Sequence, residues 1–166
     1  MEFNFLIMAI AALIPMVLGF VWYNPKVFGT AWMNACGFTT EDLKGGNMAV
    51  IFIVSYIFSL MLASMLNTVV IHQFGFFQTL MSEPDLMTEG TEIYQYAQDF
   101  MSKYGTNFRT FKHGALHGTM TGLFFALPVL GINALFERKG FKYIAVNVGY
   151  WTVCLALMGG VICQFA

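Results

Sequence analysis

The sequence predicts an all-α integral membrane protein: a bundle of four transmembrane helices, with a helical excursion outside the membrane between the second and third. Two observations predict this class. Hydrophobic residues make up 58% of the 166 residues and charged residues only 10%, whereas a soluble domain carries about 25% charged residues. Four stretches are also long and apolar enough to cross a bilayer, whose hydrocarbon core of about 30 Å requires about 20 residues of helix.

The four apolar stretches occupy most of the chain, which we treat as a single membrane domain over residues 1–166. None of them contains Asp, Glu, Lys or Arg. We expect helices rather than barrel strands, because a helix satisfies each backbone polar group within its own segment and the runs do not alternate. The first stretch is expected to be retained, since no positively charged segment precedes it. The predicted spans are residues 3–23, 48–71, 115–136 and 143–165, with an outer helical loop at 72–112.

Aromatic residues and a proline follow the first span. Trp22, Tyr23 and Trp32 are expected to anchor the chain at one membrane interface, where Trp and Tyr are enriched. Pro25 is expected to end the first helix. The run Thr39–Asp42 is typical of a helix start, with a capping hydroxyl and acidic residues in the first turn.

The long second loop carries a helical pattern of its own. Apolar residues recur at three- and four-residue spacing, which predicts an amphipathic helix outside the membrane. An isolated helix of this length is marginal in water, so its apolar stripe must be covered. The cover is either the continued second helix, in a hairpin turned near Pro84, or a partner protein. The acidic residues beside the stripe disfavour anionic lipid. The partner-facing stripe includes Ile93, Tyr96, Phe100 and Tyr104.

Small residues recur every four positions in two of the spans. Such ridges let helices approach closely, which is how helices associate without a hydrophobic driving force. The two ridges are expected either to face each other within one chain or to supply an interface between copies, and the sequence leaves both open. The ridge of the third span is Gly114, Gly118, Gly122 and Ala126, and that of the second is Ser55, Ser59 and Ala63.

Polar side chains are sparse in the spans and are expected to bond across helices rather than to contact a substrate. Asn133 lies eleven residues after Gly122. That separation is about 20° around an ideal helix of 3.6 residues per turn, so Asn133 is expected on the close-packed face. The remaining members of this polar set are Asn67, Asn147 and Tyr150.

Histidines are the sole candidates for metal ligands. His113 and His117 are four residues apart and share a helical face, a spacing that can hold zinc when a third ligand arrives. His72, at the end of the second span, is the one other histidine, and neither helix offers a carboxylate. We therefore expect interfacial hydrogen bonding and no bound metal or other cofactor. A metal-dependent intramembrane enzyme using His113 and His117 is the minor alternative.

Several features that the sequence lacks disfavour whole classes of function. Proton- and ion-coupled transporters usually carry ionisable residues within the membrane, and these spans have no charged residue. Phosphate loops, nucleophile elbows and HExxH motifs are absent from the sequence, so we do not expect an enzyme. The net charge of −1 provides no basic patch for nucleic acid. The expected partners are the lipid bilayer and this chain itself or other membrane proteins.

Two functional classes remain. The first is an interaction or accessory subunit that packs in a homo-oligomer or a larger membrane complex. The alternative is a small uncoupled carrier or channel, formed by an oligomer and lined by polar side chains. Gentle purification followed by mass measurement separates them, because a stoichiometric partner favours the first and a pure homo-oligomer favours the second.

Motifs at both ends of the chain resemble a family of small bacterial four-helix membrane proteins known only as a domain of unknown function. The resemblance implies a bacterial inner-membrane protein and no particular activity, and it does not extend to the long second loop. Lys and Arg number five in the first and third loops and three in the second, which favours both termini outside the cytoplasm. The motifs are Trp22-Tyr23-Asn24-Pro25, Phe28-Gly29, Trp32-Met33, Glu41-Asp42-Leu43, His117-Gly118, Asn133, Phe136-Glu137, Asn147 and Gly149-Tyr150.

Overall fold

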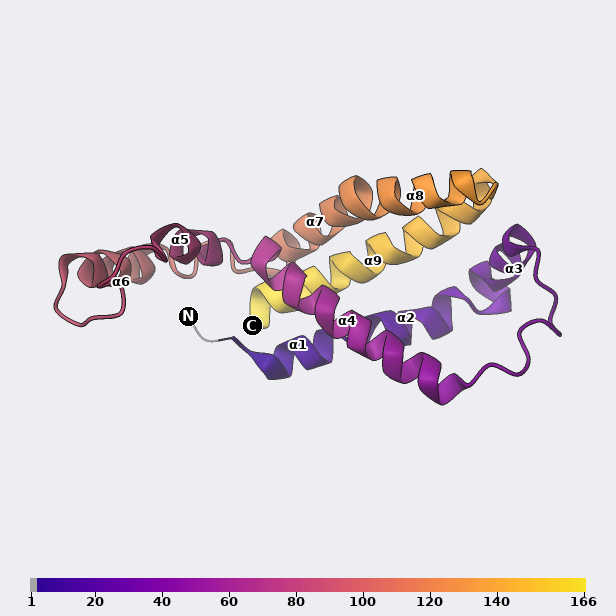
Figure 1. The fold of residues 1–166 in the computed structure, drawn as a ribbon, viewed down its shortest axis with the longest axis horizontal. Helices are drawn as coiled ribbons and strands as arrows, with labels where there is room; N and C mark the ends of the chain where they lie inside the picture. Colours follow the sequence, from indigo (N-terminus) through magenta and orange to yellow (C-terminus); the bar gives the residue numbers. More distant parts are fainter. Residues whose placement is uncertain (1–2) are drawn as a thin grey trace.

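The computed structural model describes residues 3–166, and the elements that it describes there are helical (Figure 1). Four helical stretches are long and apolar enough to cross a membrane, so the chain is a multi-pass membrane protein. The first stretch is divided in two, and the third contains a π-helical segment. The spans are α1 (Phe5–Ala11) with α2 (Ile14–Trp22), α4 (Met48–Val70), α7 (Phe111–Thr121) with η2 (Gly122–Ala126) and α8 (Leu127–Phe136), and α9 (Phe141–Phe165).

The C-terminal helix α9 is the centre of the bundle. Of its most apolar stretch, 56% is buried, against 22%, 17% and 11% in the first, second and third spans. α7 and α8 lie along α9, whereas α4 crosses it at an angle (Figure 1). The main core cluster joins α1, α4 and α9 through Met8, Ala11, Ala63, Leu66, Val70, Ile71, Leu155, Met158, Ile162 and Cys163.

The break in the first span has an identifiable cause. Pro15 cannot donate a backbone hydrogen bond and disfavours a regular helix in the preceding turn. The amide of Leu13 therefore bonds three residues back, to Ile10 O at 3.1 Å. The carbonyl of Ala9, which a regular helix would pair with Leu13, instead accepts a hydrogen bond from the Tyr56 hydroxyl at 3.2 Å. A side chain of α4 thus satisfies a backbone group that the break exposes.

The π-helical segment η2 corrects the expected position of Asn133. Asn133 is exposed, although Gly122 is buried. The prediction that they share the close-packed face assumed a regular helix throughout. A π-helical turn takes in more residues than an α-helical turn, so it rotates the following residues relative to those before it. The insertion of η2 between the two residues turns Asn133 away from the neighbouring helices.

The connection between the first two spans contains helix that the sequence did not indicate. After α2 the chain forms a π-helical segment η1 (Pro25–Gly29) that continues into α3 (Thr30–Cys36). The predicted helix start at Thr39 is wrong. Asp42 Oδ2 accepts from the Thr39 amide at 2.8 Å and from its hydroxyl at 2.6 Å, as a capping residue would. The chain nevertheless forms a turn that ends at Gly45, since glycine disfavours helix propagation.

The outer excursion is a hairpin of two helices, α5 (Gln73–Leu80) and α6 (Glu92–Tyr104). It extends away from the four spans (Figure 1). The rings of Phe76 and Phe100 stack with centroids 3.9 Å apart, and Ala97 is buried. The middle of the stripe therefore packs on the continuation of the second span, the first of the two alternatives that the sequence left open, whereas Tyr96 and Tyr104 remain about half exposed.

Candidate functional site

The glycine ridge of the third span packs on α9 within the same chain. A methyl group added at any of its three glycines would overlap backbone atoms of α9. The ridge therefore does not face the Ser55–Ala63 ridge of α4, and it is not free to join two copies. Ala126, the last residue of the π-helical segment, is partly buried against the main core. The closest approaches pair Gly114 with Gly159, Gly118 with Leu155 and Gly122 with Thr152.

The ridge of α4 is divided between a packed half and an open half. Ser59 and Ala63 are buried, 3% and 0% exposed, and lie where α4 crosses the bundle. Asn67, one turn further on, is also buried, and among the described residues its Nδ2 atom has no hydrogen-bond partner. Ser55 is exposed and lines a hollow. The small residues of α4 thus permit close approach over about two turns.

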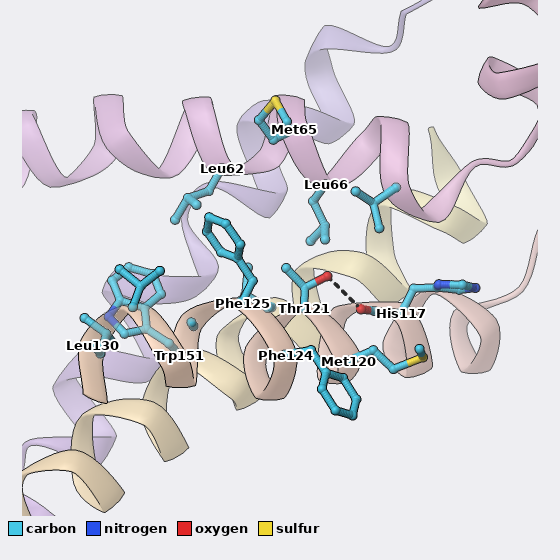
Figure 2. A pocket seen from close by; sticks show the side chains of 14 residues that line it. Leu62, Met65, Leu66, His117, Met120, Thr121, Phe124, Phe125, Leu130 and Trp151 are labelled. Atoms are coloured by element: carbon cyan, nitrogen blue, oxygen red, sulfur yellow. Dashed lines mark hydrogen bonds between the residues drawn. The ribbon is translucent and has the colours of Figure 1, made fainter. Parts of the chain in front are cut away.

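Two hollows lie on the two sides of α4, next to α9. One, of about 770 Å³, lies between α4 and the η2–α8 segment. The other, of about 980 Å³, lies between α4 and α2. Leu62, Met65 and Trp151 line both, so we treat them as one cleft. Figure 2 shows the first hollow, with His117 at one end and Trp151 at the other, and with side chains of α4 opposite those of the third span.

A cluster of aromatic and polar side chains joins the first span to α9 at the end far from the termini. Tyr23 donates its hydroxyl hydrogen bond to Asn147 Oδ1 at 3.0 Å, and Trp22 Nε1 donates to the Val146 carbonyl at 3.1 Å. Tyr150, buried, donates to the Pro15 carbonyl at 2.6 Å.

These bonds account for the polar groups of the aromatic cluster. The Asn147 amide nitrogen also donates within its own helix, to the Tyr143 carbonyl at 2.9 Å. Trp32 packs edge-on against Tyr23, with ring centroids 5.4 Å apart. Because these polar groups are bonded to a neighbouring helix or within α9, the cluster holds helices together rather than presenting groups to a ligand.

The three histidines meet at the opposite end. His72 lies where α4 gives way to α5, and its Nε2 atom is 2.7 Å from His113 Nε2. The rings of His113 and His117 are 4.5 Å apart, one turn along α7. One potential ligand nitrogen from each histidine lies within 4.8 Å of the other two. The expected hydrogen bonding is present between His72 and His113, and the His117 ring lies beside both of theirs.

The ring of Phe108 covers the histidine cluster. Its centroid is 6.0 Å from that of His72 and 5.1 Å from that of His113. His117 belongs both to this cluster and to the lining of the cleft. Its backbone carbonyl accepts a hydrogen bond from Thr121 at 2.9 Å (Figure 2). The cluster therefore has an apolar cover on one side and the cleft on the other.

Arg109 was not singled out from the sequence, yet it ties the start of α7 to the end of α9. Its Nε atom donates to the Cys163 carbonyl at 2.8 Å, and its Nη2 atom donates to the Ala166 carbonyl. The arginine thus satisfies carbonyls that a helix end leaves without partners. The Gly159-Gly160 pair of the fourth span was the available signal for the partner of the glycine ridge.

The fold defines the class: a polytopic helical membrane protein with a histidine cluster at the mouth of an apolar cleft. The chain belongs to the family described as protein of unknown function DUF1761, whose model matches residues 6–163. The sequence resemblance to a membrane family of unknown function is therefore confirmed. No curated protein and no solved structure matches the chain.

Proposed function

We propose that this protein is an interaction subunit of a larger membrane complex, and that the α5–α6 hairpin is the element that contacts the partner. The observation that carries the proposal is the exposure of apolar side chains on the hairpin. Met81 and Met87 are 76% and 85% exposed, and Tyr96 and Tyr104 are about half exposed. Apolar side chains of the spans can be covered by lipid, but those of a hairpin outside the bilayer are covered only by protein.

The charge of the hairpin specifies the kind of partner. Residues 73–104 hold five acidic side chains and a single lysine. Such a surface is repelled by anionic lipid headgroups, which attract Lys and Arg. A protein surface that combines basic and apolar side chains complements both properties of the hairpin.

The hairpin is built to hold its shape without the partner. Gln73, buried at the base, donates from Nε2 to the carbonyls of Tyr104 and Asn107 at 3.1 Å each. These bonds fix the end of α6 against the start of α5, and the Phe76–Phe100 stack fixes the middle. A preformed surface loses little conformational freedom on binding, which favours affinity.

The alternative remains a small uncoupled carrier. Its polar path would have to use the cleft, where the lining of the described residues is largely apolar. Tyr150 and Asn147, at one end, are already bonded to neighbouring helices. The cleft gives less support to solute passage than the hairpin gives to docking.

The test is gentle purification of the tagged full chain from its native membrane, followed by native mass spectrometry. We expect a stoichiometric partner. Tyr96→Asp should release it, because the change places a charge among exposed apolar side chains. Gln98→Asp, which adds the same charge at an exposed polar position of the same helix, should retain it. A homo-oligomer with an aqueous axis, in which neither variant changes the mass, would refute the proposal and favour the carrier.

We also propose that the protein resides in a bacterial cytoplasmic membrane with both termini outside the cytoplasm. The start of α1, the end of α9 and the hairpin lie at one end of the bundle (Figure 1), so a single measurement assigns the sidedness of all three. Glu89→Cys and Glu137→Cys place thiols at exposed acidic positions at opposite ends. An impermeant thiol reagent applied from outside should label Glu89→Cys alone, whereas labelling of Glu137→Cys alone would reverse the orientation.

A further inference from the structure

We propose that His72, His113 and His117 form a zinc-binding site with three imidazole ligands and a fourth position open toward the cleft. The distances between the imidazole nitrogens support this site. With zinc–nitrogen bonds of about 2.0–2.1 Å, tetrahedral geometry places the ligand nitrogens about 3.3 Å apart. The observed separations are 2.7 Å for one pair and no more than 4.8 Å for all three. The required spacing lies between these two observed values.

The backbone supports of the three ligands are independent of any metal. His113 and His117 lie on one face of α7, while Gly114 and Gly118 on another face contact α9 backbone. The helix start is fixed by Thr110, whose hydroxyl accepts a hydrogen bond from the His113 amide. When the ligands of a site belong to well-packed helices, little free energy is lost in ordering them as the metal binds.

His72 is fixed from the other side of the site. The two residues before it, Val70 and Ile71, are 1% and 2% exposed and belong to the main core. Gln73, the residue after it, is buried and bonded to the base of the hairpin. Two helices from different parts of the sequence therefore direct imidazoles to one point. A motif of two histidines on one helix lacks this third ligand.

The chemistry of the donors specifies the metal and the fourth ligand. Imidazole nitrogens suit zinc and its neighbours in the transition series, whereas magnesium and calcium prefer oxygen ligands. Three neutral histidines leave the charge of a divalent ion uncompensated. The open position therefore suits water, hydroxide or the anionic group of a molecule that lies in the cleft, because His117 lines the cleft.

The competing explanation is a hydrogen bond between two neutral imidazoles, which accounts for the short His72–His113 distance without a metal. It does not require His117. The two explanations therefore differ in the role of the third histidine, and the experiment is designed around that residue.

The test uses the full chain in detergent, purified with a tag that contains no histidine and stripped with a chelator. Cobalt replaces zinc as the spectroscopic probe. We expect one ion per chain, the strong visible absorption of four-coordinate cobalt, and an apparent Kd of about 1 μM or tighter. Zinc should displace the cobalt and raise the thermal midpoint of unfolding.

Variants assign the ligands. The chain contains three histidines in total, so each change removes one candidate. His72→Ala and His117→Ala should each weaken binding about 100-fold or more, because loss of a mere supporting residue already costs 10- to 100-fold. Asn133→Ala, an exposed polar position at the far end of the same span, should bind as the wild type does.

Three results would overturn the proposal. The first is the absence of cobalt binding to the wild-type chain. The second is a thiolate-to-cobalt absorption band, which would assign a cysteine ligand. The third is binding that His117→Ala leaves unchanged. Gel filtration of each variant reports its assembly, and the wild-type spectrum decides the matter if a histidine variant does not assemble.

Discussion

The two sides of α9 are packed in opposite ways. On one side α7 lies so close that the glycines at its surface meet backbone atoms of α9. On the other side the buried residues of α4 begin only at Ser59, its first half touches the bundle through Phe52 and Tyr56, and a cleft flanks its crossing of α9. Both α7 and α4 are apolar helices of the spans, so overall hydrophobicity does not account for the difference in their packing.

The difference follows from side-chain size along each helix. In lipid, helices gain little from burying apolar surface and associate where small residues let their backbones approach. The third span presents glycine at each turn of its contact, whereas the small residues of α4 that are buried are Ser59 and Ala63. Close contact therefore extends along α7 and stops midway along α4.

The largest effect is expected from Gly118→Leu. A side chain at this position would overlap the Leu155 carbonyl of α9, and overpacking of a tight contact costs about 3 kcal/mol. Thermal unfolding in detergent and gel filtration measure the loss. Gly131→Leu is the matched control on the same span, because a methyl group there would lie 4.0 Å from Leu127 Cδ1, an ordinary van der Waals contact. Equal loss in both variants would show that the ridge is not special.

A smaller effect is expected on the α4 side. Ser59→Leu should destabilise the fold by about 2 kcal/mol, since Ser59 is buried at the crossing. Ser55→Leu should be nearly neutral, because Ser55 lines the cleft and is exposed. Thermal midpoints of the two variants provide the measurement. If Ser55→Leu proves as harmful as Ser59→Leu, the cleft is filled by protein in the native assembly.

The aromatic cluster is expected to contribute less per bond. Tyr150→Phe removes the hydrogen bond to the Pro15 carbonyl, and hydrogen bonds between membrane helices contribute about 0.6–2 kcal/mol. We expect a loss of about 1 kcal/mol in unfolding free energy, measured by denaturant titration in mixed micelles. Tyr94→Phe, on the hairpin, is the control and should cause no change in the spans. An unchanged midpoint for Tyr150→Phe would mean that packing alone joins the first span to α9.

The smallest effect is expected in the exposed turn beyond α3. Hydrogen bonds from Thr39 hold the pKa of the Asp42 carboxyl below its ordinary value of 3.8. The contribution of this pair to the turn is therefore present above the ordinary pKa and is lost as the pH falls through the lower folded pKa. Thr39→Ala should raise the pKa of Asp42 toward 3.8, measured by nuclear magnetic resonance titration. Thr40→Ala is the control, and a pKa unchanged by Thr39→Ala would contradict the assignment.

The three histidines show which contacts local sequence predicts and which it does not. His113 and His117 are close in sequence, and helical periodicity alone places them on one face. His72 is forty-one residues before His113, and no local pattern indicates that its ring meets theirs. The sequence predicted hydrogen bonding by His113 and His117, and among the described residues the structure gives one such bond, between His113 and His72. It also predicted no metal, which the proposed cobalt titration tests.

Asn133 illustrates the opposite case. Its predicted position was computed from a regular helical repeat, and a single π-helical turn displaced it. Whether a helix contains such a turn depends on the tertiary contacts that accept its displaced residues, here those between Gly122 and Thr152. An error in the assumed helical repeat grows with distance along the helix. The predicted helix face is therefore more accurate for residues near the glycine ridge than for residues far from it.

By itself, the sequence determined the class of the protein, the number and approximate bounds of its spans and the amphipathic helix of the outer loop. These depend on composition and periodicity, which are local properties that the bilayer and the helix repeat convert directly into structure. The tertiary structure alone decided which helix receives the glycine ridge, where the cleft opens and that three histidines converge. Those outcomes depend on distances between residues far apart in the chain, which packing sets and no local pattern encodes.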